Sequence, residues 1–85
     1  MVSANGFSKD RVLQDFGNRL RRVRRTRNLR QLDVESLGLS YKYYQRLEAG
    51  QSNPTLLTLH RLAAAFEIPL SELFCSDRQH DTSVS

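Results

Sequence analysis

The spacing of apolar side chains near the start of the chain predicts a long amphipathic helix. Apolar residues recur there at three- and four-residue intervals and would share one face: Val12, Phe16, Leu20 and Val23. Ser8 or Asp10 can cap the start of this helix, and Asn28 tolerates the left-handed turn that would end it.

The next segments have the pattern of two short helices joined by a tight turn. We expect a short helix over Gln31–Leu37, a turn at Gly38 and a further helix over Tyr41–Ala49. Ser40 can cap this further helix, and Gly50 supplies its left-handed stop. This is the pattern of a helix-turn-helix.

The helix over residues 41–49 has two chemically different faces. Tyr44 and Leu47 would form an inward stripe. The opposite face holds Tyr41, Lys42, Gln45, Arg46 and Ala49. Such a face can hydrogen-bond to base edges and phosphates, but many ordinary solvated helices have the same composition. The pattern alone leaves both interpretations open.

A loop that ends at Pro54 separates this unit from a more hydrophobic helix. Thr55 can cap that helix, and its apolar side chains repeat at helical spacing: Leu56, Leu59, Leu62, Ala63 and Phe66. Ile68 and Pro69 break it, and residues 70–74 predict a last helical turn. From Ser76 onward the polar sequence has no core-forming pattern.

No segment favours a strand, so the chain is predicted to form a compact, all-α, five-helix domain. We expect a flexible N-terminal arm over residues 1–10, a helix-turn-helix domain over 11–75 and a flexible tail over 76–85.

Positive charge is concentrated in the first predicted helix. The 85 residues carry a formal net charge of +4, but residues 9–30 hold nine Lys or Arg against two Asp, a local charge of +7. Localised positive charge favours a polyanion, either nucleic acid or an anionic membrane surface. No apolar run is long enough to span a membrane or act as a signal sequence, so we expect a cytoplasmic protein without membrane contact.

Residues that support catalysis or metal binding are scarce. Cys75 has no partner for a disulfide, and with His60 and His80 it gives no metal-ligand spacing. There is no glycine-rich phosphate loop and no convincing nucleophile arrangement. We therefore expect no enzyme activity, no metal and no cofactor.

Several fragments, in their order and spacing, resemble the phage repressor and Cro type of helix-turn-helix domain, the lambda-repressor-like or XRE family. They are residues 16–24, 28–31, 38–40, 47–50, 53–56 and 62–63. The resemblance covers about residues 11–74. It implies a sequence-specific DNA-binding transcriptional regulator that acts as a dimer on a palindromic operator, with its third helix in the major groove. Restriction-modification controllers, phage repressors and antitoxins share this module, so the regulated system is not implied.

The resemblance also implies roles for single residues. Tyr41, Lys42 and Arg46 match the positions that face base edges, and Arg46 suits a bidentate contact to guanine. Tyr43 and Gln45 are candidates for flanking or phosphate contacts. The full set of expected DNA contacts is Arg30, Gln31, Ser40, Tyr41, Lys42, Tyr43, Gln45 and Arg46.

The segment between Gln31 and Gly50 departs from the family pattern, because it is one residue shorter than expected. If this chain is aligned with the family pattern forward from Gln31, Val34 takes an apolar position of the second helix. If it is aligned backward from Gly38, Val34 takes a position that the family fills with a small residue. We prefer a gap late in the second helix. Gln31 and Arg30 both remain candidates for the phosphate contact at the start of that helix.

The resemblance also implies an ion pair inside the domain. Arg24 and Glu48 match a structural ion pair between the first and third helices. The last predicted turn has three large apolar side chains, and we expect them to form a self-association surface: Leu70, Leu73 and Phe74. The alternative is that they close the core of the single chain.

Two other functions remain as alternatives. One is an antitoxin that mainly covers a protein partner, and the other is an RNA-binding protein that uses the basic first helix.

Overall fold

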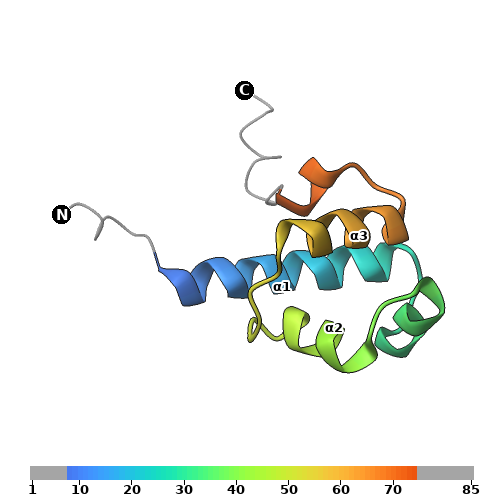
Figure 1. Ribbon diagram of the computed structural model, residues 1–85, viewed down its shortest axis with the longest axis horizontal. Helices are drawn as coiled ribbons and strands as arrows, with labels where there is room; N and C mark the ends of the chain where they lie inside the picture. The colour runs from blue at the N-terminus through green and yellow to red at the C-terminus, as the bar shows by residue number, and fades with distance from the viewer. Residues whose placement is uncertain (1–7, 75–85) are drawn as a thin grey trace.

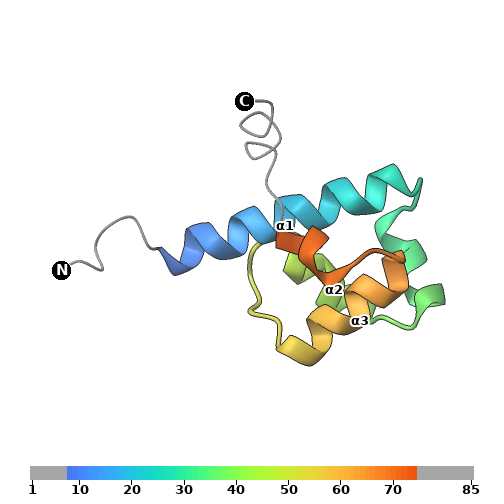
Figure 2. The same cartoon turned by 90° about the horizontal axis from the view of Figure 1, so that it is seen from above.

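The structure, a computed structural model, describes residues 8–74, which form three α-helices and two 3-10 helices (Figures 1 and 2). In chain order these are α1 (Lys9–Thr26), η2 (Gln31–Leu37), α2 (Tyr41–Glu48), α3 (Leu56–Phe66) and η3 (Leu70–Phe74). No strand occurs between residues 8 and 74, which confirms the all-α prediction there. The expected count of five is reached only if the 3-10 helices η2 and η3 are included.

The segments at both ends of the chain fall mainly outside this description. Of the arm expected over residues 1–10, residues 9 and 10 belong to α1. Residues 1–7, Cys75 and the tail expected over 76–85 lie outside the described residues. Within residues 8–74, no helix combines the length and the apolar character needed to cross a bilayer.

Each α-helix begins after a hydroxyl side chain that caps it. The oxygens of Ser8, Ser40 and Thr55 each accept a hydrogen bond from the backbone N–H three residues later, at 3.1 to 3.3 Å. Of the two caps considered for the first helix, Ser8 is the one that the structure uses. These bonds satisfy backbone donors that the helix itself leaves unpaired.

Left-handed residues end four of the helical segments or follow them closely. Asn28, Gly38 and Gly50 have φ values of 58°, 89° and 75°, at the places where the sequence indicated turns. Glu67, with φ 57°, ends α3 in the same conformation, although it is not a glycine. No local pattern indicated a left-handed residue at this position, because Glu rarely adopts positive φ.

The core lies between α1 and the elements gathered along its C-terminal half (Figure 1). Helix α1 contacts α2 and η3, while η2 packs on α2 and η3 packs on α3. The buried apolar side chains come from every element: Phe16, Leu20, Val34, Tyr44, Leu47, Leu62, Ala63, Phe66 and Leu73. Val34 is fully buried, as expected if the shortened segment is aligned from Gln31.

The structure corrects one residue, Leu73, of the expected self-association surface. Leu73 is 0% exposed and belongs to the core of the single chain, so it cannot serve as an exposed dimer contact. The guanidinium of Arg19 donates a 2.9 Å hydrogen bond to the Leu73 carbonyl oxygen and holds η3 against α1. Leu70 is partly buried against the core, and only Phe74 of the three remains exposed.

In α1 and α3, the buried apolar face is shorter than the spacing of apolar residues predicted. Val12 is 51% exposed and Leu56 is 65% exposed. Figure 2 shows the first turn of α3 at the end that lies away from α1. A helical period predicts which side chains share a face, but not where the neighbouring element stops covering that face.

Candidate nucleic-acid interface

The outward face of α2 presents the side chains that the sequence placed there. Lys42, Gln45, Arg46 and Ala49 are exposed and Tyr41 is half-buried. On the opposite side, Tyr44 and Leu47 are each 1% exposed and lock the helix into the core. An exposed face on a rigidly packed helix holds its side chains in a fixed frame, as a recognition surface requires.

Ser40 and Tyr43, two further expected DNA contacts, also have structural roles. The Ser40 oxygen caps α2 by accepting from the Tyr43 amide, while its own hydrogen stays available as a donor. Tyr43 is half-buried and packs against the core cluster.

Arg24 and Glu48, paired on the basis of the sequence, form a bidentate ion pair in the structure. Arg24 Nε donates to Glu48 Oε2 at 2.6 Å, and Nη2 donates to Oε1 at 3.1 Å. The third nitrogen, Nη1, donates to the Leu29 carbonyl oxygen at 2.8 Å. Arg24 is 7% exposed and Glu48 is 1% exposed, so this pair joins α1 to the end of α2 inside the domain.

Burial and hydrogen bonding act on the Glu48 carboxylate in opposite directions. Burial, the largest single influence, would raise the pKa of Glu48, but hydrogen bonds led by that from Arg24 outweigh it and hold the pKa below its ordinary value. The bond to Glu48 raises the pKa of Arg24. Both groups are therefore charged at neutral pH.

A chain of hydrogen bonds runs from this buried pair to the surface of α2. Gln31 Nε2 donates to Glu48 Oε1 at 2.9 Å. Gln45 Nε2 in turn lies 3.5 Å from Gln31 Oε1 and 3.1 Å from the Tyr41 hydroxyl, and donates to both oxygens. Sequence reasoning placed these residues individually but missed that they form one network.

Arg30 and Gln31, the two candidates at the start of η2, are held differently. The Arg30 side chain is 80% exposed and pairs with Asp33, Nη2 to Oδ1, at 3.1 Å. The Asp33 carboxylate also accepts from the Arg30 backbone N–H at 2.7 Å, which caps η2, and these hydrogen bonds lower the pKa of Asp33. The Gln31 amide is held inward by Glu48, so Arg30 is the more exposed of the two.

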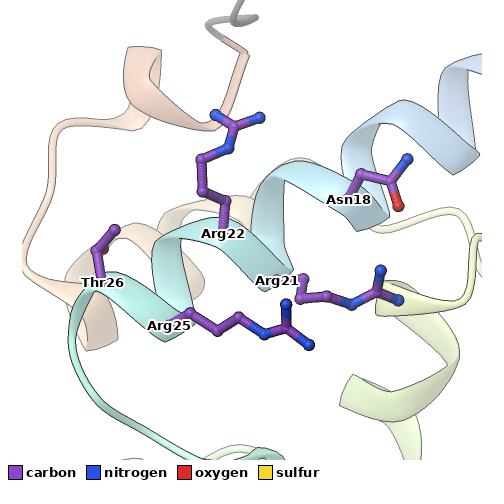
Figure 3. A pocket seen from close by; sticks show the side chains of 5 residues that line it. All are labelled: Asn18, Arg21, Arg22, Arg25 and Thr26. Atoms are coloured by element: carbon purple, nitrogen blue, oxygen red, sulfur yellow. The ribbon is translucent and has the colours of Figure 1, made fainter.

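Arginines from the middle of α1 line a shallow hollow beside this network (Figure 3). The lining residues are Asn18, Arg21, Arg22, Arg25 and Thr26. In Figure 3, Arg21 and Arg25 extend in the same direction, while Arg22 points to the other side of the helix. Arg21 Nε lies 3.6 Å from Glu48 Oε1, which places this basic surface next to the α2 terminus.

Two buried features at this junction were not predicted. Gly17 of α1 lies so close to the last backbone carbonyls of α2 that a side chain would not fit. The Tyr44 side chain is 1% exposed and lies beside the ion pair, where burial, the largest influence, and the Glu48 carboxylate both raise the pKa of its hydroxyl. Between residues 8 and 74, no group of three His, Cys, Asp or Glu side chains could hold a metal ion.

Comparisons of sequence show that this chain is similar to helix-turn-helix regulators. A helix-turn-helix family model matches residues 20–73. The chain is 41% identical over 58 residues to an uncharacterized HTH-type transcriptional regulator, y4dJ, of Sinorhizobium fredii, covering 67% of this chain and 75% of that protein. It is 36% identical over 63 residues to the control protein C.MunI of a Mycoplasma species, covering 69% and 82% respectively.

Comparisons of structure agree with those of sequence. The restriction-modification controller protein C.AhdI of Aeromonas hydrophila is similar with a TM-score of 0.70 at 36% identity, over 74% of this chain and 97% of that one. A transcriptional regulator of Vibrio cholerae is similar with a TM-score of 0.75 at 27% identity, over 85% and 41%. All of these relatives are described as regulators or controllers, in agreement with the prediction of a regulator rather than an enzyme.

Proposed function

Because this chain belongs to the helix-turn-helix family of DNA-binding transcriptional regulators, we propose that it binds a palindromic operator as a homodimer, with α2 in the major groove. The observation that carries this proposal is the exposed polar row on α2, whose opposite side is fixed in the core. In this proposal Arg46 makes a bidentate contact to guanine, and Lys42 and Tyr41 contact neighbouring base edges.

The phosphate contacts in this proposal come from residues around α2. Arg30 and Gln31 at the start of η2, Ser40 and Tyr43 at the start of α2, and the basic side of α1 surround the outward face. Arg21 and Arg25 extend from α1 beside the α2 terminus (Figure 3). Phosphate contacts of this kind fix the position of the protein on DNA without reading its sequence.

The proposed dimer would use an apolar face on the other side of the domain. A groove between α1, the loop before α3 and η3 is lined in part by Val12, Pro54 and Phe74. The first turn of α3 begins after Pro54 and the cap residue Thr55, and it exposes Leu56 and Leu57 at 65% and 67%. A second copy of this chain would cover these side chains and present two α2 helices about 34 Å apart, one turn of DNA.

Selection of bound duplexes from a random DNA pool at fixed salt tests the proposal. We expect enrichment of one palindrome with half-sites centred about 10 base pairs apart. Arg46→Ala should lose roughly 1 to 3 kcal/mol on that site and relax preference at one symmetric pair of positions. Arg61→Ala, which removes an exposed arginine of α3, is the matched control and should change neither. Enrichment of no sequence would overturn the proposal.

We propose that the regulated genes are those of a restriction-modification system. This proposal is supported by the structural similarity to the controller protein C.AhdI, because the similar region covers 97% of the C.AhdI chain. A restriction or modification gene beside this one, with the selected palindrome upstream of it, is the expected arrangement. The selected palindrome upstream of unrelated genes only would contradict this role. A cytoplasmic location is part of the same proposal.

A further inference from the structure

We propose that Gln45 reads an amino base, adenine or cytosine, through its Oε1 atom alone, because the network beneath it fixes which end of its amide faces the DNA. The inference rests on the proposed placement of α2 in the major groove. It assigns to Gln45 a base contact in place of the flanking or phosphate contact expected from the sequence.

The orientation begins at the buried carboxylate of Glu48. Both of its oxygens accept hydrogen bonds from the Arg24 guanidinium, at 2.6 and 3.1 Å. An ionised carboxylate only accepts hydrogen bonds, so the end of the Gln31 amide that lies 2.9 Å from Glu48 Oε1 must be its amino group. The reversed Gln31 amide would place two acceptor oxygens against each other in a partly buried site, which is costly.

Gln31 passes this orientation on to Gln45. With its amino group turned toward Glu48, Gln31 presents its carbonyl oxygen to Gln45, at 3.5 Å from Gln45 Nε2. The same Nε2 donates to the Tyr41 hydroxyl at 3.1 Å. An amide nitrogen has two hydrogens, so both donors of Gln45 are engaged and only its oxygen remains free.

The network therefore leaves one hydrogen-bond acceptor beside one donor on the outward face of α2. Gln45 offers Oε1, and the Tyr41 hydroxyl, which accepts from Gln45, keeps its own hydrogen to donate. In the major groove, adenine N6 and cytosine N4 are donors, whereas guanine and thymine present acceptors. A free glutamine can rotate its amide to meet either kind of base, but this one is held as an acceptor.

Base preference measured on the selected operator tests the inference, because a merely structural role would not change preference at one position. For the unaltered protein we expect one symmetric pair of positions to prefer an amino base by about fivefold or more. Gln45→Glu keeps an acceptor and should keep this preference, although its charge weakens binding to all sequences. Gln45→Lys offers donors only and should prefer guanine or thymine there.

Substitution of Gln31 tests the relay itself. Gln31→Leu frees the Gln45 amide to rotate. The operator position that faces Gln45 should then lose its preference for an amino base, while the position that faces Arg46 should keep its base preference. Gln51→Leu removes an exposed glutamine that follows α2 and lies outside the network, and it should leave the preference unchanged. Circular dichroism on each variant checks that the helices are intact.

The outcomes separate this inference from the proposed function. If no palindrome is enriched, the proposed function fails and the inference fails with it. If a palindrome is enriched and Arg46→Ala relaxes one position, but Gln45→Lys retains the amino base or Gln31→Leu leaves every preference as it was, the inference alone is overturned.

Discussion

Gly17 of α1 lies against the backbone carbonyl of Glu48 at the end of α2, with no room for a side chain between them. A Cβ atom on Gly17 would stand 2.7 Å from the carbonyl oxygen of Leu47 and closer still to that of Glu48. Carbonyls at the end of a helix cannot move aside as a flexible side chain would. The close approach of the two helices is also what lets the Arg24 guanidinium reach the Glu48 carboxylate.

Gly17→Ala should therefore destabilise the fold, even though alanine is the better helix former. Separating α1 from α2 enough to fit one methyl group should cost about 2 to 3 kcal/mol in the free energy of unfolding. Urea denaturation followed by circular dichroism measures this cost. Asn18→Ala, at the next and exposed position of the same helix, should be neutral or slightly stabilising. Equal midpoints for the two variants would show that the contact is not tight.

Arg24 and Glu48 should depend on each other for stability. Removing either partner leaves the other charge buried, so Arg24→Met or Glu48→Leu alone should cost about 3 kcal/mol or more. The double variant should recover much of this loss, because no buried charge remains. The exposed Arg30 and Asp33 pair gives a contrast, in which single substitutions should be mild and additive. Additive effects at residues 24 and 48 would rule out the coupling.

Stability should also depend on pH through Glu48. A carboxyl whose pKa is lower in the folded than in the unfolded chain stabilises the fold above its ordinary pKa of 4.5. That contribution disappears as the pH falls through the folded-state pKa. The stability gap between the unaltered protein and Glu48→Gln should therefore be widest at pH 7 and shrink below about pH 4.5. Urea denaturation at several pH values measures the gap, and a constant gap would contradict the prediction.

DNA affinity should fall steeply with salt, because cationic side chains that meet phosphates release counterions. Binding should weaken by roughly a hundredfold between low and physiological salt. Arg21→Gln and Arg25→Gln should each reduce the slope of log affinity against log salt by about one if each contacts a phosphate. Arg11→Gln, in the first turn of α1, serves as the charge-matched control. Unchanged slopes for Arg21 and Arg25 variants would mark them as an ordinary solvated face.

Self-association should depend on the apolar face that includes the first turn of α3. Leu57→Glu places a charge on that face at a side chain that is 67% exposed, so the fold should persist while the dimer dissociates. Sedimentation velocity at several concentrations measures the state of assembly. Leu32→Glu, at an exposed leucine of η2, is the control and should remain dimeric. A Leu57→Glu variant that still sediments as a dimer would move the interface elsewhere.

Features that depend on a few consecutive residues were predictable from the sequence. The cap at Ser40, the left-handed Gly38 and Gly50 and the inward phase of Tyr44 and Leu47 all occur where expected. Local hydrogen bonding and helical period decide each of them. The exposed face of α2 follows directly from that phase, which is why most of the candidate contacts could be placed in advance.

Features that depend on distant segments were predicted less well. Gln31 and Glu48 are 17 residues apart, and nothing local in either indicates their hydrogen bond. Leu73 has the same apolar side chain whether it closes a core or meets a second chain, and only its packing against α1 decides. The 3-10 form of η2 was also unforeseen; it rises about 2.0 Å per residue against 1.5 Å for an α-helix, which suits a segment one residue short.

Glu48 lies beneath the exposed side chains of α2, so the residues that face outward and those that join the helices should change at different rates in evolution. Substitutions at Lys42 or Arg46 touch nothing that the core requires, so most should alter stability by no more than about 0.5 kcal/mol. Substitutions at Gly17 or Glu48 break the junction of two helices, so selection should remove them whatever DNA the protein binds. After a gene duplication, one copy can therefore acquire a new target through the outer positions while both copies inherit the same scaffold.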